Sequence, residues 1–90
     1  MDYLQYRRHF AWRNNTGAFK AEGGGMYFYG AKGSPDIFVL TRGGVLISLE
    51  VKTSTGRQSP DQKAWQQRCE EIGAAYHVVR SVDQVQKIGL

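Results

Sequence analysis

Cysteine is nearly absent: Cys69 is the only one among the 90 residues, so no internal disulfide can form. A chain without disulfides suits a reducing compartment. There is no apolar run approaching the roughly 20 residues that a membrane-spanning helix needs. The first ten residues, MDYLQYRRHF, also lack the apolar region of a secretory signal. We therefore expect a soluble, cytoplasmic protein.

The chain is also short, with no repeat and no low-complexity segment beyond three consecutive glycines. Its hydrophobic content of 41% is ordinary for a folded protein. We expect one domain over residues 1–90, with a core so small that a partner subunit would help to stabilise it. Twelve basic against eight acidic residues give a net charge of +4. This excess favours a polyanion partner such as nucleic acid, although many unrelated small proteins share it.

The first third of the chain carries weak signals for helix and strand. Tyr3, Tyr6 and Phe10 fall at helical spacing. Asn14 begins the sequence NNTG, which is typical of a turn. The expected elements are, in order, a helix over 2–12, a turn at 14–17, and short strands over 18–21 and 26–29, with the three glycines between them.

The stretch SPDIFVLTRGGVLISLEVK predicts two strands joined by a tight turn. The strands are expected over 36–41 and 45–53, because both segments are rich in Val, Ile, Leu and Phe. Residues 42–44 would form a three-residue hairpin loop. Such a loop ends with a residue in the left-handed backbone region, and Gly44 suits that position.

A second helix is predicted over 59–72 by its capping chemistry. Ser59 is a good N-cap, Pro60 suits the first helical position, and Gln62 completes a capping box. Gly73 would end the helix. The remaining elements are a strand over 75–80 and an end helix over 82–88, where Ser81 and Gln84 repeat the capping-box spacing. The order α-β-β-β-α-β-α implies an α/β fold with a parallel strand–helix–strand step.

The hairpin register places three charged residues on one face. A loop at 42–44 pairs Thr41 with Val45, and stepping back along both strands then sets Asp36 opposite Glu50. Lys52 lies two residues beyond Glu50 and shares its face. A two- or four-residue loop would instead turn Asp36 to the other face.

Two carboxylates held this close repel each other unless a cation or a proton intervenes. Carboxylate oxygens are ligands that Mg²⁺ prefers, and a nearby lysine stabilises developing phosphate charge. The alternative interpretation is a surface salt-bridge cluster at one end of the hairpin.

A family resemblance rests on these same residues. "PD" at 35–36 with "EVK" at 50–52 resembles the PD-(D/E)xK nuclease signature. The wider segments "GSPD", "LEVKTSTGRQSPDQKAW" and "GAAYHVVRSVDQV" are similar to the VRR-NUC family of virus-type replication-repair nucleases. The likeness covers roughly residues 30–86, with a weaker match in "WRNNTGAF". Stand-alone members occur in phages, so the compartment would then be the bacterial host cytoplasm.

The resemblance implies a restriction-endonuclease-like α-β-β-β-α-β core with a mixed central sheet. Asp36, Glu50 and the main-chain carbonyl of Val51 would bind Mg²⁺ or Mn²⁺, and Lys52 would orient or activate the attacking water. Gln62 matches the family's helix glutamine and would support the site, while its capping role is an equally good explanation. The family's first helix offers a further acid that is absent here, unless Asp2 or Glu22 replaces it or the true start of the chain lies upstream.

Basic residues near these segments are candidates for phosphate contacts, although each is more often simply solvated. Those nearest the site in sequence are Lys32, Arg57 and Lys63, with Arg13 and Arg80 as weaker candidates. His9 and His77 are not spaced as a metal pair and are interpreted as structural or surface residues. Cys69 has no nucleophile pattern around it and is interpreted as a small core residue. Trp12 is interpreted as a core residue or as part of a dimer interface.

The sequence thus predicts a metal-dependent endonuclease acting as a homodimer on branched DNA, including four-way junctions. One alternative is a nuclease of the same chemistry that acts on flaps, nicks or duplex ends. Another is a DNA-binding module whose active site has decayed, and a third is a purely structural α/β domain.

Overall fold

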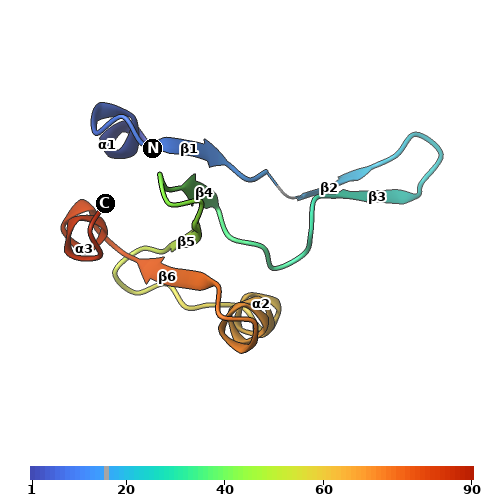
Figure 1. Cartoon of the computed structure of the whole chain (residues 1–90). Helices are drawn as coiled ribbons and strands as arrows, with labels where there is room; N and C mark the ends of the chain where they lie inside the picture. The colour runs from blue at the N-terminus through green and yellow to red at the C-terminus, as the bar shows by residue number, and fades with distance from the viewer. Residues whose placement is uncertain (16) are drawn as a thin grey trace.

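The computed structural model describes residues 1–15 and 17–90 (Figure 1). Its elements are α1 (Asp2–Tyr6), β1 (Phe10–Arg13), β2 (Gly17–Lys20), β3 (Met26–Tyr29), β4 (Ile37–Leu40), β5 (Leu46–Val51), α2 (Pro60–Glu71), β6 (Ala75–Val79) and α3 (Val82–Lys87). Across these described residues, no helix combines the length and the apolar character that crossing a membrane requires.

Four strands form the main sheet, in the order β1-β4-β5-β6. The pairs β1–β4 and β4–β5 are antiparallel, whereas β5 and β6, which flank α2 in the chain, are parallel. The expected α/β fold with a mixed central sheet is therefore confirmed. Its core order is α1-β1-β4-β5-α2-β6, which has the predicted pattern α-β-β-β-α-β, although the first strand is β1 and not one of the strands expected over 18–21 and 26–29.

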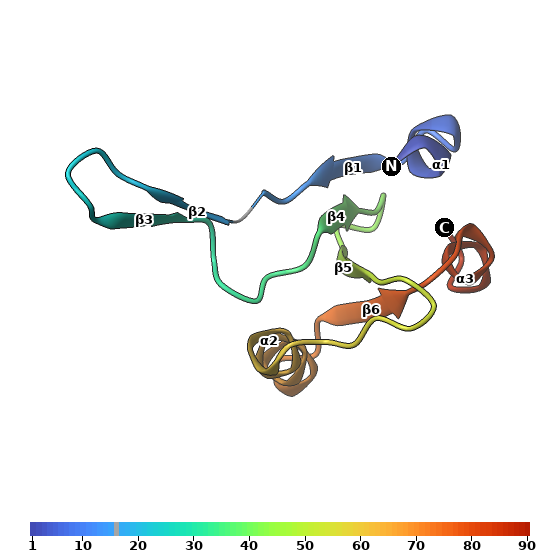
Figure 2. The same ribbon diagram turned by 180° about the vertical axis from the view of Figure 1, so that it is seen from behind.

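One face of the sheet packs against α1 and α3, which lie on the same side of the molecule in Figures 1 and 2. The buried cluster there consists of Leu4, Ile37, Val39, Leu49, Val79, Val85 and Leu90. Ile37 and Val39 alternate along β4, as expected of a strand with one buried face. This cluster holds together both ends of the chain and the middle of the sheet.

Helix α2 lies against β6 and the opposite face of the sheet, and its start follows the predicted chemistry. Ser59 Oγ accepts a hydrogen bond from the Gln62 main-chain N–H (3.2 Å), and Gln62 Oε1 accepts one from the Ser59 N–H (2.9 Å). The capping box is complete, with Pro60 in the first turn. Gly73 follows the helix with a positive φ of 79°, as predicted for its end.

The expected helix over 2–12 is wrong in its second half. Helix α1 ends at Tyr6, and Arg8 takes a left-handed φ of 60° that a helix cannot continue through. Phe10 to Arg13 then form the edge strand β1. Phe10 and Trp12 follow the two-residue period of a strand, with ring centroids 5.4 Å apart.

The weak strands of the first third do form, but outside the main sheet. β2 and β3 pair antiparallel with each other as a separate two-stranded sheet. Figures 1 and 2 show this hairpin projecting away from the rest of the molecule. The first strand of the core is therefore β1. The predicted turn at 14–17 includes Thr16, which lies outside the described residues.

The turn between β4 and β5 has the predicted length. The Thr41 main-chain N–H donates to the Val45 carbonyl (2.9 Å), and the Gly44 N–H donates to the Thr41 carbonyl (3.0 Å). Gly44 has a φ of 78°, which is the left-handed conformation expected of it. Ile37 pairs with Leu49 in the same register, so the predicted alignment of the two strands is confirmed.

The end helix begins with half of the predicted capping box. Ser81 Oγ accepts from the Gln84 N–H (3.2 Å), but Gln84 Oε1 accepts from the N–H of Arg80 (2.7 Å). The glutamine therefore reaches one residue further back than a capping box requires. The main-chain N–H of Arg80, at the end of β6, is therefore the group that donates to this glutamine, in place of the N–H of Ser81.

We predict that alanine at Gly33 destabilises the protein more than alanine at Gly44. Both glycines have nearly the same left-handed φ, 81° and 78°, so each substitution incurs about 1–2 kcal/mol of strain. A Cβ at Gly33 would also lie 2.6 Å from the Asp61 carbonyl carbon, whereas at Gly44 nothing lies within 4 Å. We expect Gly33→Ala to cost about 1–3 kcal/mol more, measured by urea unfolding. Equal costs would contradict this packing of the 30–34 loop on α2.

Candidate active site

The charged side chains predicted to converge do so where β4 begins and β5 ends. Continuing the register of Ile37 with Leu49 places Asp36 opposite Glu50. Asp36 Oδ2 accepts a hydrogen bond from the Val51 main-chain N–H (2.8 Å), which ties the two strands together. Lys52 Nζ lies 3.9 Å from Glu50 Oε1. One small area therefore holds two carboxylates and an ammonium group.

Glu50 is the unusual member of this group because its side chain is only 1% exposed. Gln62 Nε2 donates to its Oε1 (3.1 Å). The other oxygen, Oε2, is buried and has no hydrogen-bond partner. Buried polar atoms are nearly always satisfied, so an orphaned carboxylate oxygen indicates a missing proton or cation.

The environment of Glu50 raises the pKa of its carboxyl group from 4.5 to about 7. Burial is the main cause, since it removes water from the charged form. Asp36 adds to the rise, and Lys52 opposes it. A strongly shifted carboxyl beside a second acid is typical of functional sites.

These groups fit a hard divalent cation. In an extended strand the N–H and C=O of one residue point to the same neighbour, so the Val51 carbonyl faces the strand that leads back to Asp36. The available donors are then the Asp36 carboxylate, Glu50 Oε2 and this carbonyl, all oxygens. Among the residues that the structure describes, no three His, Cys, Asp or Glu side chains form a cluster, so neither Asp2 nor Glu22 supplies a third acid.

Asn14 is a positioning residue that the sequence interpretation missed. Its Nδ2 donates to Ser34 Oγ (2.7 Å) and to the Pro35 carbonyl (2.9 Å). Its main-chain N–H donates to the Asp36 carbonyl (2.8 Å). These bonds fix the backbone that carries Asp36. The signal available was the similarity of "WRNNTGAF" to the family, since Asn14 otherwise reads as a turn residue.

Tyr76 is a second missed residue, on the face that carries Glu50. It lies on β6 opposite Ser48, is 8% exposed, and accepts a hydrogen bond from Gln58 Nε2 (3.2 Å). Gln58 Nε2 also donates to Gln66 Oε1 (3.0 Å) on α2. The network thus links the loop after Lys52 to the helix that carries Gln62. Strand alternation alone would have placed Tyr76 on this face.

The predicted phosphate-binding residues have different surroundings. Lys32 Nζ lies 3.4 Å from Asp61 Oδ2, in an exposed ion pair. Arg57 and Lys63 are exposed. Arg80 Nη1 instead donates to the carbonyls of Thr53 and Gly56 (both 2.6 Å), which fixes the loop after β5.

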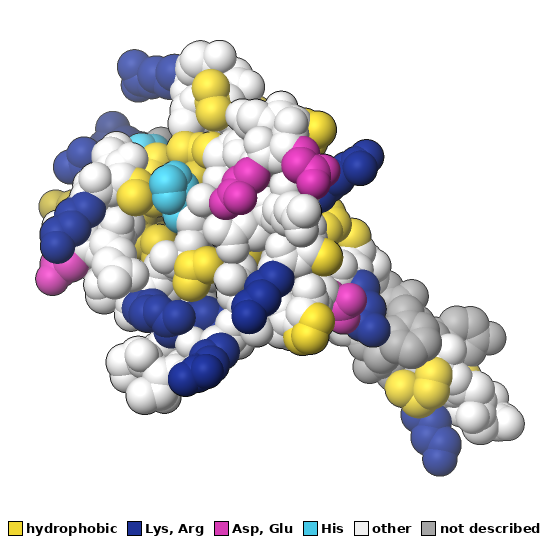
Figure 3. Space-filling model, turned by 90° about the horizontal axis from the view of Figure 1, so that it is seen from below, with side chains coloured by type: hydrophobic (Ala, Val, Ile, Leu, Met, Phe, Trp, Pro, Cys, Tyr) yellow, Lys and Arg dark blue, Asp and Glu magenta, His cyan; other side chains and the backbone are white. Residues whose placement is uncertain are grey.

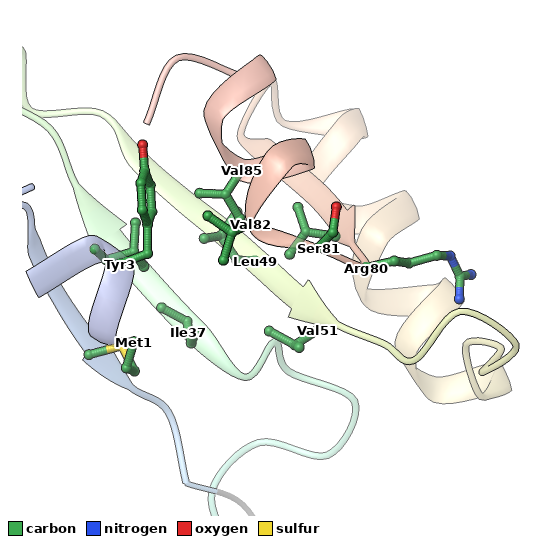
Figure 4. Close-up of a pocket in the computed structure, with 11 residues that line it drawn as sticks. Met1, Tyr3, Ile37, Leu49, Val51, Arg80, Ser81, Val82 and Val85 are labelled. Carbon is green, nitrogen blue, oxygen red and sulfur yellow. The ribbon is translucent and has the colours of Figure 1, made fainter. Parts of the chain in front are cut away.

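Two neighbouring hollows lie near the site and share Met1, Ile37 and Val51 in their linings. A polar one of about 700 Å³ is lined by Asp36 and Val51 together with Met1, Arg13, Asn14, Asn15 and Ile37. An apolar one of about 250 Å³, shown in Figure 4, lies between α1 and α3 over the core face and contains none of the three site charges. In Figure 3, Lys and Arg side chains gather in the lower middle of the view, with acidic side chains set apart from them.

The residues interpreted as structural have ordinary roles here. His9 Nε2 bonds the Leu90 carbonyl (2.9 Å), and His77 is half-buried in β6. Cys69 is buried on α2, as predicted. Trp12 is 39% exposed and packs beside Phe38, with ring centroids 5.8 Å apart.

Comparison with known protein families adds one finding. The model of the VRR-NUC domain matches residues 25–83, which is about two thirds of the chain. The matched range contains Asp36, Glu50, Lys52 and Gln62. No significant match was found among curated proteins or among solved structures.

We predict that the metal-free protein loses stability as pH rises from about 4.5 to 7. The folded state binds the Glu50 proton more tightly than the unfolded chain (pKa about 7 against 4.5), so the stabilisation is complete at low pH and is lost as pH rises. The loss is up to about 3 kcal/mol at 1.36 kcal/mol per pKa unit. Urea unfolding in EDTA at several pH values measures it.

Glu50→Gln is the matched variant, because its amide keeps an oxygen that accepts from Gln62 but cannot ionise. As pH rises through this range, the unfolding free energy of wild type should fall while that of the variant should not, so the variant becomes the more stable of the two relative to low pH. Parallel curves for the two proteins would contradict the assignment.

Proposed function

The chain belongs to the VRR-NUC domain family, which indicates a nuclease acting on DNA, and from the geometry of its site we propose a metal-dependent endonuclease. The observation that carries this proposal is the buried, unpartnered Oε2 of Glu50 beside Asp36. We take residues 1–90 as one nuclease domain. The reaction is hydrolysis of a DNA phosphodiester.

Asp36, Glu50 and the Val51 carbonyl would hold Mg²⁺ or Mn²⁺. Such an ion, when bound, stabilises negative charge on phosphate oxygens and lowers the pKa of water. It would also satisfy Glu50 Oε2 and relieve the repulsion between the two carboxylates. The Val51 N–H and Gln62 Nε2 keep one oxygen of each carboxylate fixed, which leaves the other for the ion.

In the proposed reaction a water oxygen forms a bond to phosphorus while one ester P–O bond breaks. One water hydrogen ends on the leaving oxygen, which becomes a hydroxyl, and the other strand end keeps the phosphate. Lys52 lies beside Glu50 and orients the water or stabilises the charge that develops on phosphate. Gln62 is a positioning residue, because it anchors Glu50 while capping α2.

We further propose that Lys32, Arg57 and Lys63 contact the DNA backbone near this site. All three are exposed and lie on segments that flank it: the loop before β4, the loop after β5 and the first turns of α2. Lys32 would exchange its exposed partner Asp61 for a phosphate. Surface ion pairs of this kind contribute little to stability, so the exchange costs little.

The expected test of the proposed function is cleavage of a labelled four-way junction in Mg²⁺ or Mn²⁺. Wild type should cut, and Lys52→Ala should be slower by about 100-fold or more, as expected for loss of a group that acts on the proton transfer. Lys87→Ala, an exposed lysine at the end of α3, is the matched control. Equal rates for Lys52→Ala and wild type would sink the role of Lys52, and cleavage of flaps, nicks or duplex ends alone would redirect the substrate assignment.

A DNA-binding module with a decayed site is the second candidate function. It is favoured by the absence of a third acidic side chain near Asp36 and Glu50 in the described part of the chain. Calorimetry with Mn²⁺ separates the two candidates. Retained DNA affinity without Mn²⁺ binding would support the decayed site.

We propose a homodimer, on which two sites related by a two-fold axis would suit paired cuts in a symmetric junction. Apolar side chains on the sheet face away from α1 and α3 offer a surface for the second copy. The exposed ones are Phe10, Trp12, Leu40 and Leu46. They lie side by side, because Phe10 pairs with Leu40 and Leu40 pairs with Leu46.

Light scattering at micromolar concentration should give a mass twice the 10.1 kDa of one chain. Trp12→Arg should shift the mass toward the monomer, because it places a charge in the apolar surface. A monomeric mass for wild type, both alone and with junction DNA, would rule out the dimer.

A further inference from the structure

Three arginines lie together at the end of the main sheet opposite to Asp36 and Glu50. Phe10 pairs with Leu40, so the segment before β1 lies beside the end of β4. Arg7, Arg8 and Arg42 thereby line one open hollow of about 680 Å³. Its other lining residues are His9, Thr41, Gly89 and Leu90, together with Phe10 and Leu40, where it borders the apolar surface proposed for the dimer. We call this hollow and its three arginines the arginine surface.

The charges of the arginine surface are not paired with an Asp or Glu side chain in the described part of the chain. All three arginines are exposed. Within residues 1–15 and 17–90, the ion pairs found involve other side chains, and the lining contains no Asp or Glu. The nearby Leu90 carbonyl is bonded by His9 Nε2 (2.9 Å) and the Tyr3 hydroxyl (3.2 Å). Three like charges held together without a paired Asp or Glu side chain favour binding of an anionic partner.

Arg8 adds an independent sign of function, because it stands where glycine is normally found. The His9 N–H donates to the Leu4 carbonyl (3.0 Å) and the Arg8 N–H to the Gln5 carbonyl (2.9 Å). This is the Schellman pattern at a helix end, in which the left-handed residue is usually Gly. Arg8, with a φ of 60°, holds that position at a cost in backbone strain. Strain of this kind concentrates at sites where the side chain has a task.

The distance from the arginine surface to the candidate active site suits a DNA arm. Asp36 and Thr41 are five residues apart along one strand, or about 17 Å at 3.3 Å per residue. One base pair advances about 3.4 Å along a duplex. If a duplex lay along the edge of the sheet, the candidate active site and the arginine surface would therefore be separated by about five base pairs of that duplex.

We propose that Arg7, Arg8 and Arg42 bind backbone phosphates of a duplex arm, about five base pairs from the bond that is cut. This inference rests on the proposed function, since it takes DNA as the ligand. Guanidinium groups match phosphate oxygens in charge and geometry, which makes arginine better suited than lysine to the task. The arginine surface then acts as a second point of contact that sets the direction of the arm.

Binding of a labelled four-way junction in EDTA tests the proposal without cleavage. The variant Arg7→Gln/Arg8→Gln/Arg42→Gln is compared with Lys20→Gln/Arg68→Gln/Lys87→Gln, which removes the same charge from exposed positions elsewhere. The logarithm of the DNA-binding constant falls linearly with the logarithm of the salt concentration. Each lost phosphate contact makes this slope shallower by about 0.9. We expect the first variant to lose about two to three in slope and the control less than one. Equal slopes for the two variants would overturn the proposal, and would leave another polyanion as the partner of the arginines.

Arg8→Gly separates binding from folding. Glycine removes the backbone strain at the end of α1. The urea concentration at the midpoint of unfolding should therefore stay the same or rise. The same variant should bind the junction several-fold more weakly than wild type. Wild-type affinity in Arg8→Gly would count against Arg8 as a phosphate ligand.

Failure of the proposed function has a different signature from failure of this inference. If wild type binds no DNA at any salt concentration, the proposed nuclease itself is wrong. If wild type binds but does not cut, the comparison of the two triple variants still decides the role of the arginine surface.

Discussion

The buried carboxylate of Glu50 is the constraint around which the rest of the molecule is arranged. An ionised carboxyl with one unsatisfied oxygen is costly in a protein interior, and Glu50 is placed beside a second acid that makes ionisation harder still. Two contacts compensate in part for this cost, one from Gln62 and one from Lys52, while a third bond fixes the neighbouring acid. Gln62 donates to one oxygen, Lys52 lies nearby, and the Val51 N–H holds the neighbouring Asp36 in place. A cation at the remaining oxygens would complete this arrangement.

The start of α2 shows how folding and site geometry share the same atoms. One side-chain amide of Gln62 accepts from the Ser59 N–H through its oxygen and donates to Glu50 through its nitrogen. The two interpretations weighed for this glutamine, cap and site support, are therefore compatible. Because the cap fixes where the helix begins, it also fixes the position of the donor. The close packing of Gly33 on Asp61 brings the chain leading to Asp36 against the same helix turn.

The elements that sequence could predict are those specified by neighbouring residues. The cap of α2 depends on residues 59–62, and the hairpin register depends on the loop at 42–44. Each can therefore be predicted from a few consecutive residues. The alignment of Asp36 with Glu50 followed from that register. Strand β1 was not predicted, because Tyr3, Tyr6 and Phe10 also fit a helix and only the left-handed Arg8 ends it. Asn14 and Tyr76 were missed because their partners, Pro35 and Gln58, are distant in the chain.

The two unfavourable features of the structure lie at opposite ends of the same strands. At one end Glu50 is buried with an unsatisfied oxygen, and at the other Arg8 takes a strained backbone conformation among like charges. Neither improves the folded state of the isolated chain, so the apolar cluster between them, which includes Val39 and Leu49, must offset both. A metal cation would satisfy the free oxygen of Glu50, and a phosphate would offset the like charges around Arg8 while leaving its backbone conformation unchanged. In the proposed metal-dependent nuclease, one complex with DNA would supply both the cation at Glu50 and the phosphates at the arginine surface.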